Sequence, residues 1–131
     1  MATIRRFEDL EIWKLARELC QDIFELTLRE DFSHDYGLKN QIRDSSGSVM
    51  DNIAEGFERG GNREFIRFLS IAKGSCGETR SQLYRSYDRK YISLEELERL
   101  KERLFTLARK INNLIDHLDH SEFKGNKFKN R

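Results

Sequence analysis

Residues that commonly bind metal ions are few in this sequence, and their spacing does not suit a metal site. The three histidines are His34, His117 and His120. None of them lies three residues after a glutamate, the spacing that di-iron helix bundles use to point both side chains inward. Cys20 and Cys76 have no cysteine or histidine at the short spacings typical of a zinc site. The sequence therefore predicts no metal and no cofactor.

Glu55 and Glu78 are candidates for acid–base chemistry, because each interrupts a stretch of regularly spaced apolar residues. Arg59 follows Glu55 by four residues, however, and Arg43 and Asn52 lie on the same predicted helix. We expect Arg43, Asn52, Glu55 and Glu78 to form a structural polar network that ties two helices together. Since no glycine-rich phosphate loop and no serine or cysteine nucleophile with a nearby base is visible, we predict a protein without catalytic residues that is not an enzyme.

Arginines recur every four residues at Arg59, Arg63 and Arg67, so they project along one side of a helix. Such a stripe, beside a helix N-terminus, can bind RNA phosphates. The alternative is a solvated surface on which Glu58 and Glu64 balance the charge. The end of the chain is also basic. We predict nucleic-acid contacts at Arg59, Arg63, Arg67, Lys124, Lys127, Lys129 and Arg131.

The amino-acid composition indicates long helices and few turns. The 131 residues include no proline and only 8 glycines, whereas a β-rich fold needs many turn residues. The net charge of +1 does not suit a strongly basic nucleic-acid module, so such a function must depend on a local patch. Residues 1–10 lack the apolar run of a signal peptide or membrane helix. Because both cysteines are expected to stay reduced, we predict a cytoplasmic protein that contacts no membrane.

Four amphipathic segments predict an all-α fold, an antiparallel up-and-down four-helix bundle. In each of them apolar residues recur at steps of three and four. The segments cover residues 10–29, 38–57, 62–89 and 93–118. Short links between segments favour antiparallel neighbours. We expect the bundle to occupy residues 1–119 and residues 120–131 to form a flexible basic tail.

The last segment has the clearest pattern. Ser93 followed by Glu96 is a capping box, which marks the beginning of a helix, and Asp9 and Asn62 are the expected N-caps of earlier helices. Residues 30–36 lack periodicity and are expected to form a loop. An unbroken heptad seam after the capping box predicts core residues. They are Leu97, Leu100, Leu104, Leu107, Ile111, Leu114 and Leu118.

Two further features predict where helices approach closely and whether subunits associate. Small residues gather in the middle of two segments, at positions 45–48 and 74–77, and predict a close helix crossing there. Several apolar residues exceed what one bundle core requires, which indicates a second buried face and hence a homo-oligomer. These residues are Trp13, Phe24, Leu28, Ile66, Ile71 and Phe105.

Several short motifs lie in the second and third segments. They are Gln41-Ile42-Arg43, Asn52-Ile53-Ala54-Glu55-Gly56, Arg59, and Phe68-Leu69-Ser70-Ile71-Ala72-Lys73-Gly74-Ser75 with Glu78. Together with Phe7-Glu8-Asp9-Leu10, Trp13 and Tyr91-Ile92, these motifs resemble those of the 23S rRNA intervening-sequence proteins, also called the four-helix-bundle protein family. The resemblance covers about residues 7–118. One departure is Val49-Met50, where the family usually has an Ile-Pro step.

The resemblance implies a four-helix bundle that assembles into a ring-like homopentamer and has no established enzymatic activity. Some members of the family are encoded inside insertions of bacterial large-subunit rRNA genes. A related branch accompanies the reverse transcriptases of diversity-generating retroelements and binds protein and RNA. Two functions therefore stay open: an oligomeric scaffold that associates with structured RNA, and a protein-interaction hub that docks a partner enzyme without nucleic acid.

Overall fold

The computed structural model describes the backbone of residues 4–129 and the side chains of residues 4–121, and this part of the chain contains helices and no strand. The predicted all-α class is confirmed. The elements, in chain order, are the short 3₁₀ helix η1 (Phe7–Asp9) and the α-helices α1 (Glu11–Leu26), α2 (Glu30–Ser33), α3 (Tyr36–Glu58), α4 (Asn62–Asp88) and α5 (Leu94–Lys129).

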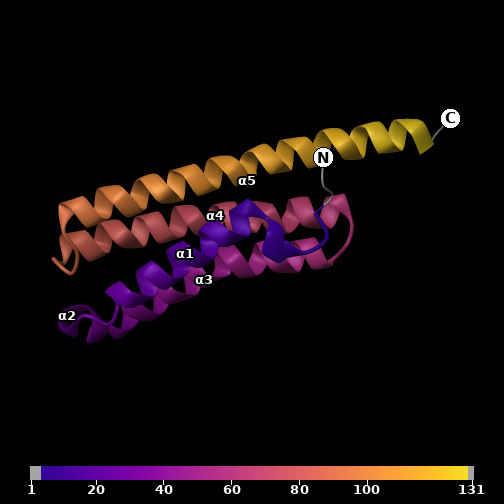
Figure 1. Cartoon of the computed structure of the whole chain (residues 1–131). Helices are drawn as coiled ribbons and strands as arrows, with labels where there is room; N and C mark the ends of the chain where they lie inside the picture. The colour runs from indigo at the N-terminus through magenta and orange to yellow at the C-terminus, as the bar shows by residue number, and fades with distance from the viewer. Residues whose placement is uncertain (1–3, 130–131) are drawn as a thin grey trace.

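Four long helices form a bundle in which successive helices run in opposite directions. α3 packs most extensively against α4, α4 also packs against α5, and α1 lies against α3. The contact between α1 and α5 is smaller, so this is the loosest side of the bundle. Figure 1 shows α5 running along the whole of α4, with the short α2 at the end where α1 gives way to α3.

The predicted boundaries of the first three segments and the predicted start of the fourth agree with the structure to within a few residues, but the connections differ. The loop expected at residues 30–36 contains α2, because the fully buried Phe32 holds this turn against the core. Asp35 then caps α3 by accepting a 3.2 Å hydrogen bond from the amide of Leu38. The predicted N-cap at Asp9 is wrong, since this residue lies in η1.

The capping box predicted for α5 is confirmed. The Ser93 amide donates to Glu96 Oε1 at 2.9 Å, and the Glu96 amide donates to Ser93 Oγ at 3.1 Å. Asn62 does not cap α4 as predicted, because it is the first helical residue after Gly61. Its side-chain amide instead donates to the carbonyl oxygen of Leu118 at 3.5 Å, and so joins α4 to α5.

α5 does not end where the sequence predicts the bundle to end. Helical backbone continues past residue 119 to Lys129, and Figure 1 shows this part of α5 extending beyond the connection between α3 and α4. The segment expected to be a flexible basic tail, residues 120–131, thus begins as a continuation of the last helix. The side chains of residues 122–131 lie outside the described part of the chain, and the flexibility of the segment stays a prediction.

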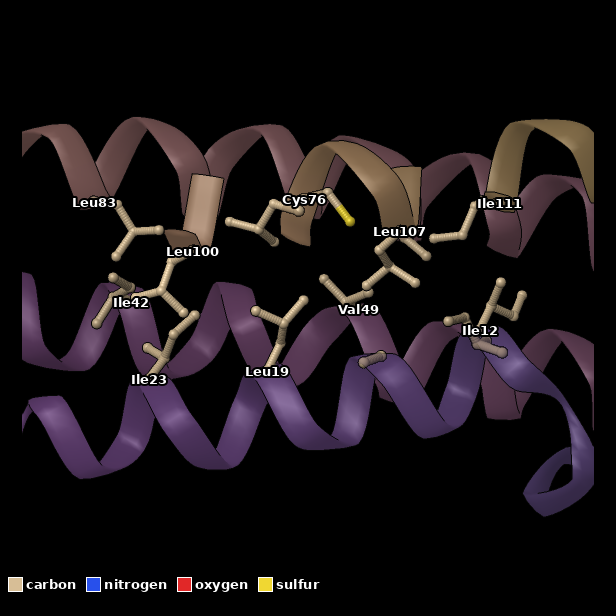
Figure 2. Close-up of a cluster of buried hydrophobic side chains, with 14 of the residues drawn as sticks. Ile12, Leu19, Ile23, Ile42, Val49, Cys76, Leu83, Leu100, Leu107 and Ile111 are labelled. Carbon is tan, nitrogen blue, oxygen red and sulfur yellow. The ribbon is translucent and has the colours of Figure 1, made fainter. Parts of the chain in front are cut away.

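The core is a column of mostly aliphatic side chains from α1, α3, α4 and α5. In Figure 2, Leu19 of α1, Val49 of α3, Leu83 of α4 and Leu107 of α5 point into the same space between the helices. The predicted heptad seam of α5 is confirmed for its first five members, each at most 2% exposed, and its last two are partly buried. The five are Leu97, Leu100, Leu104, Leu107 and Ile111.

Ser48 Oγ and Ser75 Oγ lie 3.0 Å apart where the crossing of α3 and α4 is predicted, so the two helices do meet there, but the glycine that α4 packs against is Gly56. A Cβ atom at Gly56 would lie 2.6 Å from Phe68 Cβ, closer than carbon atoms can approach. By contrast, no atom lies within 4 Å of the Cβ position at Gly47, Gly74 or Gly77. The absence of a side chain at Gly56 therefore lets the end of α3 lie directly against α4.

Three connections meet at one end of the bundle, and polar contacts tie them together. Arg29, after α1, donates to Glu96 Oε1 of α5 at 3.0 Å and to the carbonyl oxygen of Tyr91 at 3.1 Å. Asp35, before α3, accepts hydrogen bonds from Arg89 at 2.7 Å and from the Tyr91 hydroxyl at 2.9 Å. The hydrogen bonds from Arg29 lower the pKa of Glu96 to about 2.

Gly56→Ala is expected to destabilise the bundle by about 1–3 kcal/mol, because Phe68 Cβ cannot yield without moving α4. The matched control is Gly74→Ala, which adds a methyl group in open space within the same packed pair of helices and should stabilise by about 0.5–1 kcal/mol. Urea titrations measure both changes. Small effects of the same sign in the two variants would contradict the close contact at Gly56.

Glu96→Gln tests the polar end of the bundle. Because the folded-state pKa of Glu96 is about 2, below its ordinary value of 4.5, its ionised form stabilises the fold above about pH 4.5. That stabilisation disappears as the pH falls from 4.5 to 2. Glutamine keeps the oxygen that caps α5 but removes the charge. Thermal melts should therefore show a Tm deficit of the variant at pH 7 that shrinks over this window, and a deficit independent of pH would contradict the assignment.

Candidate nucleic-acid interface

The predicted arginine stripe lies where α3 gives way to α4, and we call Arg59, Arg63 and Arg67 the arginine corner. Gly60 makes the turn with φ of +86°, a conformation that glycine adopts without strain. Arg59 is the C-cap of α3, and the other two arginines lie in the first two turns of α4. All three are exposed. The structure therefore places the three predicted residues together at one end of the bundle.

Two guanidinium groups of the arginine corner lie against the same aromatic ring. Arg59 Cζ is 5.1 Å and Arg67 Cζ is 5.2 Å from the ring centroid of Phe68. The ring is only 7% exposed, since the arginines and the approach of α3 at Gly56 cover it. Cation–π attraction holds the two charges in fixed positions. The sequence does not reveal this role of Phe68, because the contact combines residues from two helices.

Carboxylates flank the arginine corner. Arg59 Nη2 lies 3.0 Å from Glu55 Oε1, and both side chains are about half exposed. Arg67 Nη2 lies 3.7 Å from Glu64 Oε2, beyond hydrogen-bonding distance, so that this pair attracts by charge alone. Exposed ion pairs of this kind contribute little to stability. The cations are therefore partly balanced, as the solvated-surface alternative expects, yet they remain accessible.

The basic end of the chain leaves the bundle beside the arginine corner. The hydrogen bond from Asn62 to Leu118 fixes α5 against the first residue of α4, and the helix continues from there to Lys129. The structure thus brings the backbone of this segment near the predicted arginines. The described side chains end before the four predicted basic contacts of this segment, which are Lys124, Lys127, Lys129 and Arg131.

The four residues of the predicted polar network have other partners and do not pair with one another in the described part of the chain. Glu55 pairs with Arg59 on the surface, and Arg43 donates to Thr27 Oγ1 at 2.9 Å next to α1. Asn52 donates to Ser48 Oγ at 2.8 Å on its own helix. Glu78 is exposed and, within the described residues, forms no ion pair.

A different set of polar side chains joins α3 to α4. Ser45 Oγ donates to Gln82 Oε1 at 2.5 Å and accepts from Thr79 Oγ1 at 2.8 Å, and all three residues are buried. Ser48 Oγ and Ser75 Oγ lie 3.0 Å apart across the same interface. The small polar residues in the middle of the two helices thus serve hydrogen bonding. Their presence at otherwise apolar helix positions was the available sequence signal.

The described residues offer little else for chemistry. No group of three or more His, Cys, Asp or Glu side chains among them is suited to hold a metal ion. Burial raises the pKa of Cys76 to about 12, and burial also raises the pKa of Cys20. Both thiols therefore stay protonated and are weak nucleophiles. No helix in this part of the chain is long and apolar enough to span a membrane.

Comparisons with known proteins agree with this architecture. A similar solved structure is a protein with unknown function from the S23 ribosomal protein family of Bacteroides thetaiotaomicron, with a TM-score of 0.72 and 21% sequence identity. The match covers 79% of this chain and 97% of that chain, and at this identity it shows the fold alone. A search of curated proteins finds no match. A family comparison matches residues 8–113, most of the sequence. The chain therefore belongs to the 23S rRNA-intervening sequence protein family.

Proposed function

We propose that this protein is a non-enzymatic, oligomeric scaffold of the cytoplasm that associates with structured RNA. The arginine corner and the basic residues of segment 120–131 contact phosphates. The observation that supports this proposal most directly is the pair of guanidinium groups held against Phe68, with side chains that remain 50% and 65% exposed. Charges that are already fixed lose little conformational entropy when a ligand binds.

The carboxylates beside these arginines are weak competitors for them. An exposed ion pair contributes at most about 1 kcal/mol, whereas a guanidinium can form two parallel hydrogen bonds to a phosphate group. Glu55 is itself 53% exposed, so its side chain can turn into solvent when a phosphate takes its place. Repetition of a modest site in an oligomer multiplies the affinity for one RNA molecule.

A second candidate is a protein-interaction hub that docks a partner enzyme, and exposed apolar side chains favour it. Of the surplus apolar residues, Phe24, Leu28, Ile71 and Phe105 are each more than a third exposed. Large apolar side chains gathered on a surface are typical of sites that another protein covers. Phe24, Leu28 and Ile71 also support self-association, which the scaffold requires.

Replacing Arg63 and Arg67 together with alanine should weaken binding to a synthetic RNA stem-loop without lowering the melting temperature. We expect the slope of log K against log salt to fall by about 0.7–0.9 for each phosphate contact that is lost. Arg59 is left in place because it pairs with Glu55. The control variant removes Lys14 and Arg99, two exposed cations of other surfaces. RNA binding that is equally weak in both variants, or absent in the wild type at low salt, would overturn RNA contact at the arginine corner.

Light scattering is expected to give a mass well above the 15.6 kDa of one chain, and the family resemblance implies a homopentamer. The physical reason is that the exposed apolar side chains lose contact with water when subunits associate. A monomer at micromolar concentration would contradict the scaffold. A dimer would keep a second buried face but would exclude the ring.

A further inference from the structure

A second cationic surface lies on the outside of the seam between α4 and α5. None of its residues belongs to the arginine corner, and the predicted set of RNA contacts contains none of them. It combines cations with two aromatic rings that α4 and α5 bring together. We call it the α4–α5 face. Its residues are Lys73, Arg80 and Tyr84 of α4 and Lys101, Phe105 and Arg109 of α5.

Each aromatic ring of the α4–α5 face is paired with a cation from the other helix. Arg80 Cζ lies 4.2 Å from the centroid of the Phe105 ring. Lys101 Nζ lies 5.3 Å from the centroid of the Tyr84 ring and donates to its hydroxyl at 3.1 Å. Phe105 is nevertheless 52% and Tyr84 44% exposed. One side of each ring is therefore held by its cation while much of the ring remains open to solvent.

Further contacts fix the same seam. Lys73 Nζ donates to Asn112 Oδ1 at 2.9 Å, so that it also bridges α4 and α5. Gly77 lies between Lys73 and Arg80 on α4, and no atom lies within 4 Å of its Cβ position. No neighbouring side chain therefore covers α4 at Gly77, between these two cations.

The charges of the α4–α5 face are largely unbalanced. Glu98 pairs with Lys101 at 3.1 Å, whereas Arg80 and Arg109 form no ion pair with any residue whose side chain the structure describes. At the arginine corner, by comparison, Arg59 and Arg67 each have a carboxylate partner. The surface thus offers positive charge and aromatic area together, a combination that complements a polyanion carrying flat bases.

We infer that the α4–α5 face binds unpaired RNA nucleotides, whose bases stack on the open sides of Phe105 and Tyr84 while Arg80, Lys73 and Arg109 contact phosphates. The inference rests on the proposed RNA association and adds the class of RNA segment that this surface takes. Stacking requires bases outside a double helix, because a duplex buries the flat surfaces of its bases. The positive charge also disfavours two-fold pairing of this surface with the same surface of a second copy, which would bring like charges together.

The two surfaces differ in the chemistry that they offer to RNA. Phe68 at the arginine corner is 7% exposed and already covered by two guanidinium groups, so that corner can contact phosphates but cannot stack a base. Phe105 has an open side at which a base can extend the stack begun by Arg80. A folded RNA with a stem and an unpaired loop suits this combination of surfaces.

The test compares two RNA probes, three single-residue variants and one double variant. The probes are a single-stranded RNA that contains 2-aminopurine, whose fluorescence falls on stacking, and the same strand annealed to its complement. Phe105→Leu keeps apolar bulk but removes the ring, and Phe105→Trp restores an aromatic ring. Tyr36→Leu is the matched control, because it removes an exposed ring that also lies beside a cation, at the beginning of α3. Light scattering monitors the mass of every variant.

We expect Phe105→Leu to weaken binding of the single strand by about 5- to 150-fold, the effect of losing one stacked base. Its quenching of 2-aminopurine should diminish, while its affinity for the duplex and its mass stay unchanged. Phe105→Trp should bind like the wild type, and so should Tyr36→Leu. Replacing Lys73 and Arg109 with alanine should lower the salt slope by about 0.7 for each lost contact to the single strand.

Several results would overturn the inference. If the wild type binds RNA and Phe105→Leu binds the single strand equally well, the α4–α5 face is not a stacking surface, although RNA association through the arginine corner stands. If Phe105→Leu changes the mass but not the RNA affinity, the face is a protein interface. If Phe105→Leu weakens binding of the single strand and of the duplex equally, the α4–α5 face contacts phosphates and does not stack bases. Binding of neither probe by the wild type would remove this inference and the proposed function together.

Discussion

The contact between Gly56 and Phe68 is the constraint on which much of this structure depends. A Cβ at Gly56 would stand 2.6 Å from Phe68 Cβ, so only glycine lets the end of α3 reach α4. That approach buries the Phe68 ring beneath Arg59 and Arg67. The lack of space for a side chain at Gly56 therefore affects both the packing of α3 on α4 and the position of two cations. Because protein interiors are close-packed, the helices cannot move apart there without losing contacts.

In the middle of the α3–α4 interface, hydrogen bonds between small polar side chains join the two helices. Ser45, Thr79 and Gln82 bury their polar atoms together, and each has a partner. A buried hydroxyl without a partner is costly, so these side chains favour one register of the two helices over neighbouring ones. Apolar packing drives the bundle to form, and the polar contacts add specificity to the pairing of its most extensive interface.

The charged residues of the two cationic surfaces lie where neighbouring helices meet, and the two surfaces differ in how carboxylates balance the charge. At the arginine corner, Arg59 and Arg67 lie against the same ring, that of Phe68, and each has a carboxylate nearby. On the α4–α5 face, rings and cations alternate across the seam and few acids balance them. A chain with a net charge of +1 can therefore carry locally cationic surfaces. The spatial distribution of charge, and not its total, decides what such a protein can bind.

The sequence by itself determined the all-α class, the four long helices, the capping box at Ser93 and the buried heptad seam of α5, because these features follow from periodicity and from residues close together in the chain. It also placed the arginine corner, whose spacing is local. Only the tertiary structure decided that Gly56, and not Gly47 or Gly74, is the glycine against which the neighbouring helix packs. It likewise decided that Arg43 donates to Thr27 and that Arg80 lies against Phe105. Contacts of this kind depend on the relative rotation and register of two helices, and a pattern within one helix does not contain that information.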